Sequence, residues 1–185
     1  MLIAFVDTET TGLKAGVNRV IEAAVQLVDV RPQEMTVMSS FVLRQRVDLS
    51  MTPWSPVAMK INGYFDNPDW EKAPLAGTET ALKLWGQYAS LLGNVPLCSQ
   101  NVRFDCDMIK AELAYFDLEP TWDRRAIDIQ SFSAVAAIKM GLPKFGLHQV
   151  YDALGGPNLQ EHRAMADIER GKFVFDKVAR PFFAA

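Results

Sequence analysis

The chain has 185 residues, of which 49% are hydrophobic and 22% are charged, and its formal net charge is −3. This balance is typical of a folded globular domain and excludes a disordered or fibrous chain, and no apolar run reaches the roughly 18–20 residues of a membrane span. The acidic balance excludes the broadly basic surface with which proteins grip long duplex DNA. We expect residues 1–185 to form one domain.

The N-terminal residues 1–7 lack the basic stretch and the small-residue cleavage site of a signal peptide, so we interpret them as the start of a buried strand. Cys98 and Cys106 are the only cysteines. Secreted disulfide scaffolds carry more, and this count favours a reducing, cytoplasmic compartment.

The first part of the chain predicts three strands, at residues 2–6, 20–30 and 35–43, joined by short turns as in an antiparallel meander. Residues 44–76 are interrupted by prolines and predict an irregular segment with one short helix near 56–61.

The second part alternates between helices and short strands. We expect strands at 96–99 and 126–129 and helices at 78–92, 104–116, 131–140, 145–154 and 164–178. Three hairpin-linked strands followed by crossover units predict an α/β fold with a mixed five-stranded sheet and helices on both faces.

Asp7 and Glu9 stand where the first apolar strand emerges into polar sequence. Residues two apart on a strand point to the same face, so the two carboxylates can bind one hard cation together. A solvated strand end is the structural alternative, because Asp117 and Glu119 have the same spacing.

Asp105 lies in the first turn of a predicted helix that follows a short strand, and Asn101 is a candidate N-cap of that helix. An acid in a first helical turn is also favoured for structural reasons alone. The nearby Asp107 is turned roughly 200° away on the helix, so only one of these two aspartates can face a common site.

His162 and Asp167 form the third candidate pair. Five residues on a helix correspond to roughly 140° of rotation, so Asp167 is expected on a helix and His162 in the loop before it. A loop histidine and a solvated aspartate are the structural alternative. The other histidine, His148, lies in an amphipathic helix, where we expect a packed or surface role.

Together and in this order, these segments resemble the DEDDh exonucleases, the DnaQ-like branch of the RNase H-like fold. This family includes the proofreading subunit of bacterial replicative DNA polymerase, RNase T and oligoribonuclease. The resemblance is carried by the run from Phe5 to Leu13, by Asn101 to Asp105, and by His162 with Asp167 five residues later. It covers nearly the whole chain.

The resemblance implies a metal-dependent 3′→5′ exonuclease acting on single-stranded DNA or RNA. Two Mg²⁺ or Mn²⁺ ions would be held by Asp7, Glu9, Asp105 and Asp167, and His162 would take a proton from the attacking water. The expected partners are single-stranded 3′ ends, with a polymerase or a second copy of the chain as further candidates and no membrane.

The resemblance also implies residues that contact the substrate. Leu13 and Phe104 would pack against the terminal bases, and Thr10 and Thr11 would line the pocket for the terminal sugar. The full set of expected contacts is Thr8, Thr10, Thr11, Gly12, Leu13, Asn62, Asn101, Phe104 and His162.

The sequence departs from the family pattern at two places near these contacts. The His-Gly pair that the family often carries after the third strand is replaced by Asn62-Gly63, and Gln100 stands where a histidine often precedes the asparagine. Neither position is an expected metal ligand, so the departures concern substrate preference. We interpret Trp54, Trp70 and Trp85 as packing residues.

Three other functions are compatible with the sequence. They are a nucleic-acid-binding module of this fold without catalysis, a polymerase-accessory subunit with incidental nuclease activity, and a phosphodiesterase of small nucleotides. All five expected catalytic positions are filled, which favours the enzyme over the module.

Overall fold

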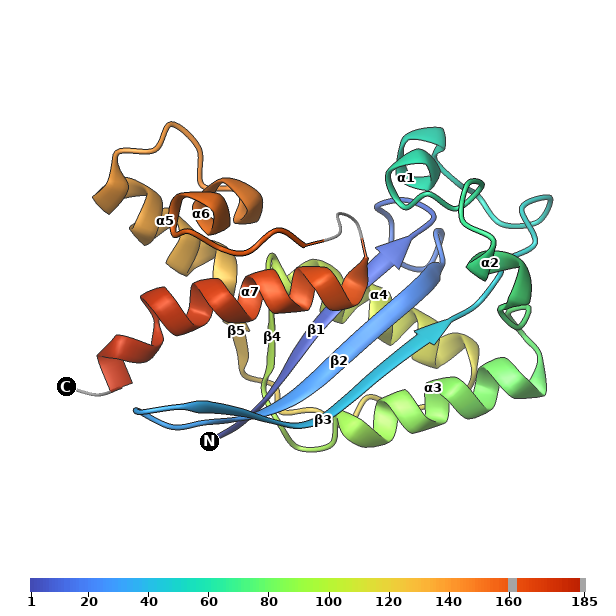
Figure 1. Ribbon diagram of the computed structural model, residues 1–185. Coiled ribbons are helices and arrows are strands. Elements are labelled where there is room, and N and C mark those ends of the chain that lie inside the picture. The colour runs from blue at the N-terminus through green and yellow to red at the C-terminus, as the bar shows by residue number, and fades with distance from the viewer. Residues whose placement is uncertain (160–162, 184–185) are drawn as a thin grey trace.

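The computed structural model describes residues 1–159 and 163–183. Its five strands form one sheet with the order β3-β2-β1-β4-β5 (Figure 1). The antiparallel pairs are β1–β2 and β2–β3, and β4 and β5 add parallel to β1. This arrangement confirms the predicted mixed sheet. The strands are β1 (Leu2–Thr10), β2 (Val20–Val30), β3 (Met35–Arg44), β4 (Leu97–Ser99) and β5 (Ala126–Asp128).

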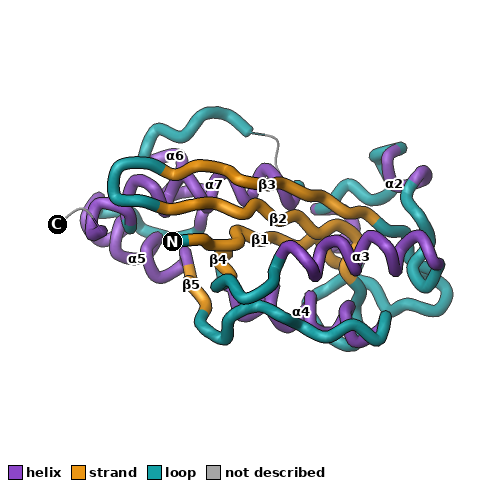
Figure 2. The backbone as a smooth tube through the Cα atoms, turned by 90° about the horizontal axis from the view of Figure 1, so that it is seen from below, coloured by secondary structure: helices purple, strands orange, loops and turns teal. Residues whose placement is uncertain are grey.

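Helices cover both faces of the sheet (Figures 1 and 2). One core cluster packs α5, α6 and α7 against one face, and a second packs α3 and α4 against the other. The helices are α1 (Pro56–Ile61), α2 (Asp69–Lys72), α3 (Glu79–Leu91), α4 (Val102–Tyr115), α5 (Ile129–Met140), α6 (Leu147–Ala153) and α7 (Ala164–Val178), followed by the 3-10 turn η1 (Arg180–Phe183).

The alternation of side chains along β1 decides which helices meet which residues. Ile3 and Phe5 belong to the core under α7, whereas Ala4 and Val6 belong to the core under α4. Because successive strand residues point to opposite faces, Asp7 and Glu9 continue the α7 side.

Two predicted boundaries in the first half are wrong. The first strand does not end at Val6 but continues to Thr10, because β2 pairs with it as far as that residue. The segment 44–76 contains the additional helix α2, a single turn begun by Pro68 and too short to show helical periodicity.

The three tryptophans interpreted above as packing residues divide into two groups. Trp70 and Trp85 are buried, as predicted for packing residues, but Trp54 is 40% exposed. Both cysteines are unpaired, and Cys98 lies in the core. Within the described ranges, no helix combines the length and apolar character needed to cross a membrane.

Candidate active site

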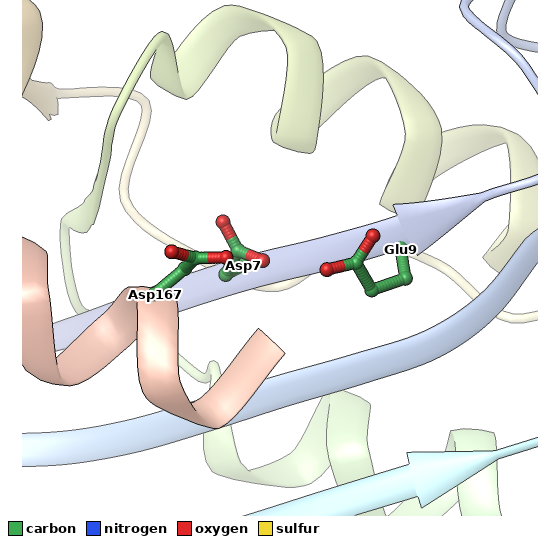
Figure 3. A group of neighbouring side chains, drawn as sticks. All are labelled: Asp7, Glu9 and Asp167. Carbon is green, nitrogen blue, oxygen red and sulfur yellow. The ribbon is translucent and has the colours of Figure 1, made fainter. Parts of the chain in front are cut away.

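Three carboxylates gather where the C-terminal part of β1, the central strand, meets the first turn of α7. Asp7, Glu9 and Asp167 each offer an oxygen, and these oxygens all lie within 4.8 Å of one another. Figure 3 shows the carboxylates of Asp7 and Asp167 side by side, with Glu9 further along the strand. The structure thus joins the first and third motifs of the sequence in one acidic cluster.

Two side chains, Arg170 and His148, lie against the carboxylate of Asp167 in the first turn of α7. Arg170, which is 3% exposed, donates 2.7 Å hydrogen bonds to Asp167 Oδ1 and to the carbonyl of Leu159. His148 Nε2, on α6, lies 3.6 Å from Asp167 Oδ1. The sequence prediction for His148 was a packed or surface role, and it overlooked this contact because α6 and α7 come together only in the folded chain.

Asp105 is buried beside this cluster but is not part of it. Its carboxylate accepts hydrogen bonds from Thr8 Oγ1 at 2.8 Å and from Ser99 Oγ at 2.5 Å. Thr8 faces the α4 side of β1, so Asp105 reaches the strand from that side, and its charge still raises the pKa of Asp7. Asp107 is exposed and lies 3.8 Å from Arg103, which confirms that the two aspartates of α4 point apart.

Burial is the main cause of the raised pKa values among these carboxylates, and repulsion between like charges adds to it at Asp7 and Glu9. Burial, followed by the charges of Asp105 and Glu9, holds the pKa of Asp7 well above its usual range. Burial and the charge of Asp167 raise the pKa of Glu9 to about 8. Burial raises the pKa of Asp105 to about 7 against the opposing hydrogen bonds from Ser99 and Thr8. Carboxylates crowded in this way favour either protons or a bound cation.

A further buried acid, Glu22, binds the N-terminal end of α7. It lies directly opposite Glu9 in the β1–β2 ladder and is fully buried. Glu22 accepts hydrogen bonds from Arg163 Nη2 at 3.0 Å, from the backbone nitrogen of Ala164 at 3.0 Å and from Arg44 Nε at 2.5 Å. The sequence analysis assigns no role to Glu22, although a glutamate among the apolar residues Val20 to Val25 is a usable signal.

His162 falls in residues 160–162, outside the described part of the chain. The residue that follows it, Arg163, is 13% exposed in its side chain and bound to Glu22. Arg163 is therefore anchored next to the acidic cluster.

The predicted substrate residues of the first motif make structural hydrogen bonds. Thr10 Oγ1 donates to the carbonyl of Gly12 at 2.7 Å, and Thr11 Oγ1 donates to the carbonyl of Pro53 at 3.1 Å. Asn62 Nδ2 donates to the carbonyl of Thr10 at 2.8 Å. By contrast, Leu13 is 84% exposed.

The second motif differs from expectation in one respect. Asn101 stands at the N-cap of α4 but makes no capping hydrogen bond with its side chain, because its backbone is left-handed (φ 61°, ψ 54°) rather than extended. Its backbone nitrogen instead donates to Asp128 Oδ1 at 3.1 Å. Phe104 is half-buried against the core under α4.

Comparison with known proteins places these features in context. A family model, RNase_T, described as exonuclease, matches residues 4–172. No curated protein sequence matches the chain. Among solved structures, the zinc-bound form of Escherichia coli exonuclease I with single-stranded DNA is 22% identical, with a TM-score of 0.74 over 98% of this chain and 42% of that one. The same enzyme with a dT13 oligonucleotide is 20% identical, with a TM-score of 0.76 and the same coverage. The chain thus spans about two fifths of the length of these structures, which share its fold.

Proposed function

The chain belongs to the exonuclease family, and we propose that it is a metal-dependent 3′→5′ exonuclease. The reaction is hydrolysis of the terminal phosphodiester bond of single-stranded DNA or RNA, with release of 5′-mononucleotides. The observation that carries this proposal is the cluster of Asp7, Glu9 and Asp167 within 4.8 Å. We take residues 1–185 as one exonuclease domain that acts in the cytoplasm.

The donor set fits divalent cations such as Mg²⁺ or Mn²⁺. The cluster offers only carboxylate oxygens, the ligands that hard cations prefer, and the repulsion between them is relieved by added positive charge. Asp7, Glu9 and Asp167 would hold the metals, with Asp105 as the fourth ligand. Cations held there would lower the pKa of the attacking water and stabilise the charge that develops on the phosphate and the leaving 3′ oxygen.

His162 takes the proton of the attacking water in this proposal. A histidine suits the role because its unperturbed pKa of about 6.5 lies near working pH. Its neighbour Arg163 is held by Glu22, and the same carboxylate binds the first backbone nitrogen of α7. Glu22 therefore ties the segment that carries the base to the helix that carries Asp167.

A single-stranded substrate is consistent with the charge of the chain. The net charge of −3 does not suit broad contact with duplex phosphates, whereas bound cations supply positive charge locally. The exonuclease I structures that share this fold contain single-stranded DNA, which supports the same substrate class here. A polymerase or a second copy of the chain is the proposed protein partner.

The test is degradation of 3′- and 5′-labelled single-stranded DNA and RNA with Mg²⁺, with Mn²⁺ and with EDTA. We expect a metal-dependent ladder that shortens from the 3′ end. His162→Ala should lower turnover by roughly 10²–10⁴-fold while metal binding persists, and Asp7→Ala should lose metal affinity as well. Asp107→Ala is the matched control because this exposed aspartate lies outside the cluster. Wild-type rates in both His162→Ala and Asp7→Ala would contradict the site.

A further inference from the structure

An exposed pair of aromatic rings lies in the segment between β3 and α3. Trp54 is 40% exposed and Phe65 is 61% exposed, and their ring centroids are 5.9 Å apart at an interplanar angle of 70°. In an edge-to-face pair, one ring presents its edge and keeps both of its own faces free of its partner. This pair therefore retains aromatic surface that the described structure does not use for its own core.

The pair is the outer end of a longer row of aromatic contacts. Phe65 contacts Tyr64 at 5.5 Å, and Tyr64 contacts the buried Trp70 at 5.4 Å. The guanidinium of Arg163 lies 5.9 Å from the Trp70 ring. Because Arg163 also binds Glu22 at the base of α7, the inner end of the row adjoins the acidic cluster. We call these four residues the aromatic row: Trp54, Phe65, Tyr64 and Trp70.

The outer end of the aromatic row is also held by hydrogen bonds to Thr11, the residue that follows β1. The backbone nitrogen of Ser55 donates to the carbonyl of Thr11 at 2.7 Å, and Thr11 Oγ1 donates back to the carbonyl of Pro53. The side chain of Asn62 binds the carbonyl of Thr10. Trp54 is thus held beside the chain that leaves Glu9, and Figure 1 shows α1 above that end of β1.

We propose that Trp54 and Phe65 form a stacking platform for the bases of the single strand that lie 5′ of the terminal nucleotide. This proposal rests on the proposed function. An exonuclease encloses the terminal nucleotide among its catalytic groups, so the remaining strand leaves over exposed surface next to them. Aromatic faces accept any base, which suits an enzyme that degrades a strand without regard to sequence.

Rigid attachment strengthens the argument for this platform. Trp70 is buried, and hydrogen bonds to Thr11, the residue after β1, hold the segment at Pro53 and Ser55. The two exposed rings therefore need little ordering when a strand arrives. The adjacent hollow, of about 370 Å³, is lined by two acids, Asp66 and Glu71, and by one cationic side chain, Arg46. The two acids repel phosphates. We therefore expect this surface to bind the bases of the strand through its aromatic rings and not to bind the phosphate backbone.

The experiment measures the affinity of 5′-labelled dT2 and dT8 by fluorescence anisotropy, in an Asp7→Asn background that prevents degradation. We expect Trp54→Ala and Phe65→Ala each to weaken dT8 binding by at least about fivefold, the lower end of the loss of one stacked base. Binding of dT2 should change much less, and Trp54→Phe should restore most of the dT8 affinity. Phe182→Ala is the matched control, because Phe182 is 65% exposed but lies on η1, near the C-terminal end in Figure 1.

The outcomes separate this proposal from the function on which it rests. Undiminished dT8 binding in both alanine variants, equal losses for dT2 and dT8, or no oligonucleotide binding by the parent protein would each overturn the platform. If the unmodified chain showed no metal-dependent cleavage while dT8 binding depended on Trp54 and Phe65, the proposed function would fail and the platform would stand. Should Trp54→Ala not fold, Phe65→Ala and Trp54→Phe decide the question.

Discussion

Buried carboxylates occur in two parts of this molecule, and their surroundings are opposite. Glu112, on α4, is 2% exposed and accepts hydrogen bonds from Arg19, from Gln45 Nε2 at 2.6 Å and from the backbone nitrogen of Val20 at 3.2 Å. Asp7 and Glu9, on β1, are surrounded instead by other carboxylates, and burial and repulsion raise the pKa of both. One region compensates its buried charge with protein groups, and the other does not.

This difference separates an acid that serves the fold, Glu112, from acids that we propose to serve a ligand, Asp7 and Glu9. Burying a charge destabilises a protein unless a partner compensates it, and Glu112 shows that this chain supplies such partners. Where partners are missing and like charges are gathered, as at Asp7 and Glu9, the arrangement favours the functional role that we propose over a structural one. Glu22 lies between the two cases, because it faces Glu9 but is bound by Arg44 and Arg163.

The largest expected effect is a loss of stability when Glu112, the carboxylate that protein groups compensate, loses its charge. Glu112→Gln leaves the guanidinium of Arg19 without its buried partner, and the free energy of unfolding should fall by about 3–5 kcal/mol. Urea denaturation measures this loss. Glu79→Gln is the control, because the exposed Glu79–Lys83 pair contributes only about 0.3–0.5 kcal/mol. Equal stability of the two variants would mean that Glu112 does not anchor the fold.

Glu9→Gln should have the opposite effect on stability. Removing one of the repelling carboxylates should stabilise the metal-free protein by roughly 1–3 kcal/mol. The same change should abolish the rise in melting temperature that Mn²⁺ gives the unmodified chain. Thermal unfolding with EDTA and with Mn²⁺ measures both, and Asp107→Asn is the control. A variant that is less stable and still responds to Mn²⁺ would refute the functional reading of the cluster.

The pH dependence of stability should also reflect the raised pKa of Glu9, with a smaller change in the free energy of unfolding. The pKa of Glu9 is about 8 when folded and near 4.5 in its ordinary state, so the folded protein binds more protons between these values. Stability of the metal-free protein should therefore fall as pH rises through this window. Mn²⁺ should reverse the trend, so its stabilisation should be larger at pH 8 than at pH 6. Calorimetric melting at the two pH values would contradict this reading if the metal effect were equal.

The smallest expected effect is on kcat and concerns Arg163, which binds Glu22. Arg163→Gln should lower kcat by about tenfold, equivalent to about 1.4 kcal/mol, because the residue after the proposed base His162 loses its anchor on Glu22. KM should change little. Arg44→Gln is a matched control, since Arg44 binds the same carboxylate from β3. Equal losses of kcat in both variants would mean that any lost partner of Glu22 lowers kcat, and that the anchoring of Arg163 has no special role.

Much of the fold could be predicted because it depends on local patterns. The apolar run of residues 20–30 and the periodicity of residues 164–178 gave β2 and α7 with their observed bounds. The alternation along β1 set Asp7 and Glu9 on one face before any tertiary contact was known. The single-turn helix α2 was missed because four residues carry no periodic signal.

The sequence by itself determined that three acidic motifs, in a fixed order, belong to one α/β fold of the exonuclease family. Only the tertiary structure decided that Asp167 joins Asp7 and Glu9, that Asp105 is held from the other face by Thr8 and Ser99, and that Glu22 ties β2 to the base of α7. It also decided that Trp54 is exposed whereas Trp70 is buried. The reason is physical: local spacing fixes the face of a strand or helix, but burial and pairing depend on what other elements bring to that face.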